Sequence, residues 1–230
     1  LAYYIHDLSP FLVEFGNGIG LRWYGLAYVL AFAAAYGLFV HLARKGYSDI
    51  RPSEVGDFIT GTALFGVILG GRLGYMLFYD WTNFIQDPLI FFKFWDGGMS
   101  SHGGILGVAI FTFIYARRKN IPWLNVGDGI VVSTPVGLFL GRCANFINGE
   151  LYGTTTSVPW AVIFPHSAGP TTPLQLVVPR HPSQLYEAAL EGLVLFGLLQ
   201  WRFWRSPVTR THPGRLSGEF LVAYAVVRMV

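Results

Sequence analysis

The run from Tyr24 to Ala43 contains no Asp, Glu, Lys or Arg, and it is the feature that most constrains how the chain folds. A helix needs about 20 apolar residues to cross the hydrocarbon core of a bilayer. Further apolar segments follow at 55–78, 103–116, 126–147, 184–204 and 216–230. Membrane strands would be about 10 residues long and would alternate in polarity. We therefore predict an all-α, polytopic integral membrane helix bundle with six spans, built by residues 1–230 as a single transmembrane domain.

The composition agrees with this class of protein. Charged residues make up 13% of the chain, whereas soluble domains carry about 25%. The excess apolar surface must therefore face lipid instead of water. The one cysteine, Cys143, excludes an internal disulfide. Because single membrane cysteines mostly serve packing, we assign it no catalytic role.

Arginine and lysine residues outside the apolar segments predict the orientation. Ten follow the first, third and fifth segments, and three lie in the other connections. By the positive-inside rule the ten face the cytoplasm, so the N-terminus lies outside, with an extramembrane outward-facing segment at about 148–182. Residues 1–17 lack the basic and apolar stretches of a cleavable signal peptide. The sixth segment is still apolar at Val230, so we expect the natural chain to be longer.

Apart from Arg202, which is counted with the basic residues at the end of the fifth segment, three arginines lie inside the apolar segments: Arg72, Arg142 and Arg228. A charge at the centre of a bilayer costs about 2.5 to 3.5 kcal/mol on insertion scales. Few acidic residues stand beside these arginines, and a guanidinium binds phosphate through two parallel hydrogen bonds. We therefore predict an anionic ligand at membrane depth, with a phospholipid headgroup as the obvious anion. The alternative is that each arginine is snorkelling or paired within the protein.

Glycines crowd the segment before the third apolar segment, on both sides of His102. Because a helix of about 14 residues rises only about 21 Å, part of this loop should dip into the membrane. Irregular backbone is tolerated there only where it lines a cavity or packs against protein. Histidine is well suited to accept a proton near neutral pH, so His102 is a candidate general base. A histidine that caps a helix or bonds to backbone is the alternative.

Polar side chains gather at the outer end of the fourth segment. Arg142 and Asn145 are three residues apart and so share a helix face. Asn148, Glu150 and Gly153 follow at the outer rim. Packing alone does not require an arginine, two amides and a carboxylate here, so we predict contacts with a substrate. Helix capping by Asn148 and the glycine after it is compatible with this prediction.

The fifth segment opens with a helix start signal. Pro182 and Ser183 are typical of a helix N-terminus, and Glu187 suits the positive end of the helix dipole. A purely structural role for this motif is an equally good interpretation.

Four motifs, in this order and register, resemble the prolipoprotein diacylglyceryl transferase family. They are GGRLGY at 70–75, WDGGMS at 95–100 with HGG at 102–104, GR at 141–142 with NFINGE at 145–150, and RHPSQLYE at 180–187. Each motif alone would be weak. The resemblance extends from Trp23 to Arg228 and so covers nearly all of the chain.

The resemblance implies a seven-span enzyme of the bacterial inner membrane, with its active site toward the periplasm and a seventh span beyond residue 230. It implies transfer of the diacylglyceryl group of phosphatidylglycerol to the thiol of the lipobox cysteine in a prolipoprotein signal peptide. A thioether forms and glycerol phosphate is released, as the first step of lipoprotein biosynthesis. No metal, organic cofactor or nucleic acid is implied.

Site residues follow from the resemblance and from the arginines inside the apolar segments. The expected catalytic residues are His102, Arg142, Arg228 and Tyr24. The expected substrate-binding residues are Asn145, Glu150, Gly153, Tyr224 and Arg72. His102 or a neighbouring group would take the proton of the thiol, and the arginines would stabilise the departing phosphate.

Two other classes of protein compete with the transferase. A phospholipid transporter or flippase also needs arginines at depth, but should carry inverted repeats, which the sequence lacks. An intramembrane protease needs a serine–histidine or paired-aspartate arrangement, and Ser100 with His102, or Asp57 with Asp128, give no clear one. Release of glycerol phosphate distinguishes the transferase from both.

Overall fold

A computed structural model describes residues 3–16, 18–93, 97–169, 171–206 and 211–229. The chain is mostly helical and divides into two compact units. Unit 1 takes the described residues of 1–35, 131–206 and 218–230, and unit 2 takes those of 36–130 and 207–217. The single transmembrane domain and the outward-facing segment at about 148–182 stay predictions.

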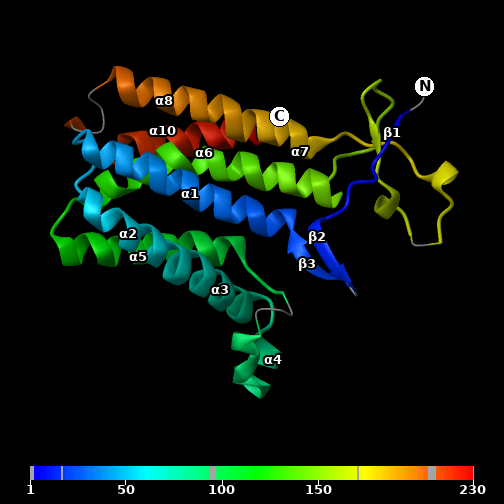
Figure 1. Cartoon of the computed structure of the whole chain (residues 1–230), viewed down its shortest axis with the longest axis horizontal. Coiled ribbons are helices and arrows are strands. Elements are labelled where there is room, and N and C mark those ends of the chain that lie inside the picture. Colours follow the sequence, from blue (N-terminus) through cyan, green and yellow to red (C-terminus); the bar gives the residue numbers. More distant parts are fainter. Residues whose placement is uncertain (1–2, 17, 94–96, 170, 207–210, 230) are drawn as a thin grey trace. The chain divides into compact units, whose positions relative to one another are not determined.

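Helices form where the apolar segments predicted them (Figure 1). The second apolar segment is one continuous helical stretch in which α2, the π-helical η2 and α3 follow one another. The fifth is built in the same way from α7, the π-helical η7 and α8. The elements that build the apolar segments are α1 (Trp23–Arg44), α2 (Val55–Gly61), η2 (Thr62–Leu69), α3 (Gly70–Phe78), α5 (Ser101–Lys119), α6 (Trp123–Asn148), α7 (Ser183–Glu187), η7 (Ala188–Val194), α8 (Leu195–Arg205) and α10 (Arg215–Val227).

Three helical stretches among the described residues are long and apolar enough to cross a membrane: Trp23–Arg44, Pro52–Phe78 and Trp123–Asn148. Large apolar side chains such as Val29, Phe65 and Leu106 are exposed on the helices. These helices agree with the predicted class of membrane protein. The number of six spans, and a seventh beyond residue 230, stay predictions.

Short strands add to the helices, which the all-α prediction did not include. β1 (Tyr4–Ile5) pairs in parallel with β4 (Val162–Ile163), and β2 (Phe11–Gly16) forms an antiparallel hairpin with β3 (Ile19–Arg22). Gly16 and Gly18 flank the hairpin turn with φ of 109° and 73°, where glycine is favoured. Short 3₁₀ helices η1 (Pro52–Glu54), η3 (Pro88–Phe92), η5 (Pro165–Ser167) and η6 (Leu174–Leu176), and the short helix α4 (Trp81–Gln86), complete the connections.

In unit 2, α5 runs alongside η2 and α3 with their backbones in close approach (Figure 1). A Cβ at Gly74 would lie 2.5 Å from Gly103 Cα, and one at Gly107 would lie 2.3 Å from the carbonyl oxygen of Gly66. Small residues allow this approach, as is common between membrane helices. The core of the unit gathers Phe39, Ile50, Val55, Phe58, Ala116 and Val126.

In unit 1, α6, the stretch from α7 to α8 and α10 lie side by side (Figure 1). Gly192 of η7 packs on α6, because a Cβ there would lie 2.6 Å from the Cβ of Phe139. Arg202 of α8 bonds Glu219 of α10 through two of its nitrogens, at 2.8 and 2.9 Å. These contacts hold the stretch from α7 to α8 against α6 and against α10.

Candidate active site

The outer end of α6 closes with a glycine cap. Gly149 has φ of 66°, and its N–H donates to the carbonyl of Phe146 at 2.9 Å. The N–H of Glu150 donates to the carbonyl of Asn145 at 3.0 Å. This pair of bonds is a Schellman motif, which ends a helix and satisfies its last carbonyls. The predicted capping by Asn148 and Gly149 is confirmed, and it turns the chain so that Glu150 faces back over the helix end.

Glu150 joins the end of α6 to the start of α7. Its Oε1 accepts hydrogen bonds from Asn145 Nδ2 at 2.9 Å and from Asn148 Nδ2 at 3.3 Å. Its backbone carbonyl accepts one from Nε2 of the fully buried Gln184 at 2.5 Å. Among the described residues Glu150 Oε2 has no polar partner, and the residue is exposed. The structure thus brings together both predicted amides and the predicted carboxylate, and adds Gln184.

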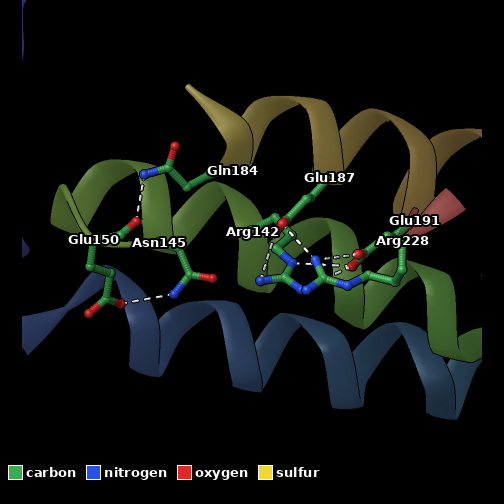
Figure 2. Close-up of polar contacts among 7 residues, drawn as sticks. All are labelled: Arg142, Asn145, Glu150, Gln184, Glu187, Glu191 and Arg228. Atoms are coloured by element: carbon green, nitrogen blue, oxygen red, sulfur yellow. Dashed lines mark hydrogen bonds and ion pairs between the residues drawn. The ribbon is translucent and has the colours of Figure 1, made fainter. Parts of the chain in front are cut away.

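Two arginines and two glutamates form a second cluster further along the same helices (Figure 2). We call Arg142, Arg228, Glu187 and Glu191 the tetrad. Arg142 Nη1 lies 2.8 Å from Glu187 Oε2, and Arg142 Nη2 lies 3.2 Å from Glu191 Oε2. Arg228 Nη1 lies 2.6 Å from Glu187 Oε1 and 3.2 Å from Glu191 Oε1. Each glutamate therefore bridges both arginines, and the formal charges of the four groups cancel.

The tetrad corrects the expectation that Arg142 and Arg228 have few acidic partners. Glu187 and Glu191 are four residues apart and project from one side of the stretch that joins α7 to η7, as Figure 2 shows. The sequence distance between α6 and this stretch hid the pairing. Glu191 has an exposed fraction of 0%. A buried carboxylate is stable only when paired, which explains why it takes both arginines.

The two arginines differ in how many of their guanidinium nitrogens lie beside a carboxylate. Arg142 is 18% exposed; its Nε donates to Glu191 Oε2 at 3.2 Å, and its Nη1 and Nη2 lie 2.8 and 3.2 Å from carboxylate oxygens of Glu187 and Glu191. Arg228, directly after α10, is 44% exposed and uses only Nη1. Among the described residues its Nε and Nη2 have no polar partner. Arg228 thus keeps donors that a phosphate can accept, while Arg142 is held by carboxylates.

Gly153 has a steric role at the start of α7. A Cβ there would lie 2.2 Å from Ser183 Oγ and 3.0 Å from His181 Cβ. Its N–H donates to the carbonyl of His181 at 2.9 Å, and its carbonyl accepts from Arg180 Nη1 at 3.2 Å. Only glycine fits here, and it seats the helix that carries Gln184 and the glutamates.

Two predicted tyrosines lie on other helices of unit 1. Tyr24 is half-buried in the first turn of α1, with its ring 5.4 Å from that of Tyr28. Tyr224 is half-buried on α10, one turn before Arg228, whose N–H donates to the Tyr224 carbonyl at 3.0 Å. Its ring lies 5.9 Å from that of Phe220.

His102 belongs to unit 2, where it corrects the expectation of a loop residue. α5 begins at Ser101, so the exposed His102 stands in its first turn. Ser100 is the N-cap, and its Oγ accepts from the N–H of Gly103 at 3.2 Å. α5 has 19 residues, so the third segment is longer than 103–116 predicted. Trp95 and Asp96 of the same motif lie outside the described residues.

Arg72 of α3, also in unit 2, is 2% exposed and lies among backbone carbonyls. It donates to the carbonyls of Ile90, Phe91, Lys93, Gly97 and Gly98. The sequence placed it with the substrate-binding residues on the strength of its charge alone.

Gln184 and Glu191 are the residues of this neighbourhood that the sequence did not single out. Gln184, Glu187 and Glu191 are three and four residues apart, which places them on one helix face and could have revealed them. Cys143 is a half-buried free thiol. The part of the chain that the structure describes contains no group of three or more His, Cys, Asp or Glu able to hold a metal ion.

Comparisons with known proteins identify the family of the chain. Residues 10–230 match the family model described as "Prolipoprotein diacylglyceryl transferase". A phosphatidylglycerol–prolipoprotein diacylglyceryl transferase of Coxiella burnetii is 48% identical over 87% of this chain and 73% of its own length. Relatives with the same name from Methylococcus capsulatus and Rhodospirillum centenum are 44% and 46% identical, over 96% and 97% of this chain and 79% and 78% of their own lengths. The chain therefore belongs to the prolipoprotein diacylglyceryl transferase family.

Proposed function

We propose that this chain transfers the diacylglyceryl group of phosphatidylglycerol to the thiol of a lipobox cysteine in a prolipoprotein signal peptide. The family and the names of the relatives support this transferase activity. They do not support the phospholipid transporter or the intramembrane protease. The enzyme would act in the bacterial inner membrane, with six spans in this chain, a seventh after them and a periplasmic N-terminus.

The reaction is a displacement at carbon. The thiol sulfur attacks the glycerol carbon that bears the phosphate ester, a C–S bond forms, and the C–O bond breaks. The electron pair leaves with glycerol phosphate, and the thiol proton passes to a base. Because the thiolate is the reactive form, a residue that accepts this proton speeds the step. His102, exposed in the first turn of α5, is our candidate base.

The observation that carries the proposal is the unequal engagement of the two arginines. Negative charge grows on the phosphate as glycerol phosphate leaves, and fixed donors stabilise such charge. Arg228 offers Nε and Nη2 to the phosphate oxygens, while its Nη1 is anchored on Glu187 and Glu191. Arg142, bound to the same carboxylates, fixes the tetrad in place. We therefore assign phosphate contact chiefly to Arg228.

The cluster at the end of α6 would receive the hydroxyl groups of the headgroup. Glu150 Oε2 is an acceptor without a polar partner among the described residues, and Asn145 holds the carboxylate from the other oxygen. Hydroxyl groups donate to such oxygens. Tyr24 and Tyr224 would orient the substrate from α1 and α10, and Gly153 would keep α7 seated.

The test is a mass assay with the full chain reconstituted in phosphatidylglycerol liposomes and a lipobox peptide. We expect the peptide with cysteine to gain one diacylglyceryl unit and glycerol phosphate to appear. The same peptide with serine in that place should gain nothing. If folded protein leaves both peptides unchanged but moves phosphatidylglycerol between leaflets, the chain is a phospholipid transporter and the proposed transferase function is wrong.

A further inference from the structure

The Arg72 guanidinium has a hydrogen-bond acceptor for each of its N–H groups. A guanidinium has five N–H donors and stays charged in proteins. Nε donates to Phe91 O at 3.0 Å, and Nη2 donates to Ile90 O at 2.5 Å and to Lys93 O at 2.9 Å. Nη1 donates to Gly98 O at 3.0 Å and also to Gly97 O. We call these five acceptors the carbonyl cage.

The cage is built from chain features suited to a cation. Ile90 and Phe91 belong to η3, and Lys93 follows its end. The Ile90 carbonyl also accepts from the N–H of Lys93 at 3.1 Å, and a carbonyl oxygen has a second lone pair that can accept from Arg72. Gly97 and Gly98 have φ of 78° and 82°, which glycine adopts without strain. A Cβ at Gly98 would lie 2.5 Å from the Tyr75 ring and 2.9 Å from Arg72 Nη1, so a larger residue would push these two side chains aside.

A phosphate would have to displace these bonds to reach Arg72. Recognition of phosphate by arginine uses two parallel N–H donors, and here the donors already point at carbonyls. Arg72 is also 2% exposed, on a helix face that packs against the segment it binds. These contacts do not fit the expected role of Arg72 in binding substrate.

We infer that Arg72 is a positioning residue that fixes the backbone of residues 90–93 and 97–98 on α3 and thereby sets where α5 begins. Between Gly98 and His102 the backbone is also held against α3 by further contacts. The N–H of Ser100 donates to the carbonyl of Gly71 at 2.9 Å, next to Arg72. A Cβ at Gly103 would lie 2.7 Å from Gly74 Cα, so the first turn of α5 sits directly on α3. His102 lies in that turn.

The effect on catalysis rests on the proposed function, because it requires His102 to be the base. The effect on the backbone does not, since it concerns only contacts within unit 2. Two measurements therefore separate them: amide hydrogen exchange over residues 90–104, and steady-state kinetics with phosphatidylglycerol and a lipobox peptide.

The test variant is Arg72→Lys in the full, reconstituted protein. Lysine keeps the charge but has three donors on a single atom, so it does not span the cage. We expect faster exchange over residues 90–104, a kcat lower by about a hundredfold, and an unchanged KM for phosphatidylglycerol. Arg51→Lys is the matched control in the same unit, on a side chain that is 73% exposed, and should change neither quantity.

Gly98→Ala perturbs the cage from the carbonyl side and should reproduce both effects, which keeps the test valid if Arg72→Lys does not fold. A raised KM with unchanged exchange in Arg72→Lys would make Arg72 a ligand and overturn the inference. Normal exchange in folded Gly98→Ala would overturn it as well. If the wild-type protein transfers nothing to the cysteine peptide, the proposed function fails, while the exchange measurements still decide whether Arg72 positions this segment.

Discussion

Arg142 and Arg228 in unit 1 lie against two carboxylates, whereas Arg72 in unit 2 lies against five backbone carbonyls. The carboxylates cancel the formal charge of the arginines and leave two nitrogens of Arg228 unused. The carbonyls use all N–H groups of Arg72 and leave its charge in place. An arginine inside an apolar segment therefore does not by itself mark a ligand site. The remaining donors, more than the charge, distinguish the two sites.

The largest expected effect comes from removing the carboxylate that both arginines share. Glu191→Ala leaves the guanidinium groups of Arg142 and Arg228 with Glu187 as their one carboxylate partner in the tetrad. Glu191 is fully buried, so the lost carboxylate is not replaced by water. Breaking a buried ion pair from one side costs about 3 to 5 kcal/mol. We expect a loss of this size in the free energy of unfolding, measured by denaturant titration in detergent micelles.

Glu219→Ala is the matched control for that prediction. It breaks a pair with Arg202 whose side chains are partly exposed, and exposed pairs contribute about 0 to 1 kcal/mol. Equal losses for Glu191→Ala and Glu219→Ala would mean that the tetrad is no more than a surface ion pair.

The second prediction separates anchoring from phosphate contact. Arg228→Lys keeps a cation near Glu187 and Glu191 but removes Nε and Nη2. Loss of one donor to a developing anion costs about a hundredfold in rate, and two donor nitrogens are removed here, so we expect kcat/KM to fall by at least that factor while the protein stays folded. Steady-state kinetics with the cysteine peptide provide the measurement.

Arg202→Lys serves as the control for Arg228→Lys, since its pair with Glu219 lies elsewhere on α8 and α10. It should retain wild-type kcat/KM. Wild-type kinetics in Arg228→Lys as well would remove phosphate contact from Arg228 and weaken the contrast with Arg72.

The smallest expected effect concerns Gly153, which allows close packing at the start of α7, the helix that leads to Glu187 and Glu191. Gly153→Ala drives a methyl group into Ser183 and His181 at the start of α7. Overpacking of this kind costs about 1 to 3 kcal/mol, which thermal unfolding would detect. Gly141→Ala on α6 has open space around its Cβ and should stabilise the protein by about 0.5 to 1 kcal/mol, because alanine favours helix. A neutral Gly153→Ala would show that α7 adjusts freely.

Much of the helical framework could be predicted from the sequence. Length and a low number of charged residues locate α1, the stretch from α2 to α3, and α6, because lipid demands both properties. The cap at Gly149 was predictable because an Asn–Gly pair ends helices through a left-handed glycine. The hairpin of β2 and β3 was missed, although the glycines around its turn are a known signal.

The partners of the arginines could not be predicted in the same way. Glu187 is distant from Arg142 in sequence, and its contact depends on how α6 and α7 rotate against each other. The cage around Arg72 consists of backbone carbonyls, which every residue carries and which leave no trace in composition. For His102 a signal existed, because Ser100 is a favourable N-cap, but the surrounding glycines favoured a loop.

The tetrad also imposes an order of events during synthesis. Arg142 leaves the ribosome before Glu187 and Glu191 exist, and Arg228 follows last. At about 5 to 20 residues per second, α6 waits for seconds with an uncompensated cation. An arginine at the centre of a spanning helix costs about 2.5 to 3.5 kcal/mol on insertion, and Arg142, in the last two turns of α6, costs less than that. If both helices span the membrane as predicted, we expect the helix that carries the glutamates to stabilise the inserted state of α6, and ribosome stalling between them to lower the inserted fraction of α6.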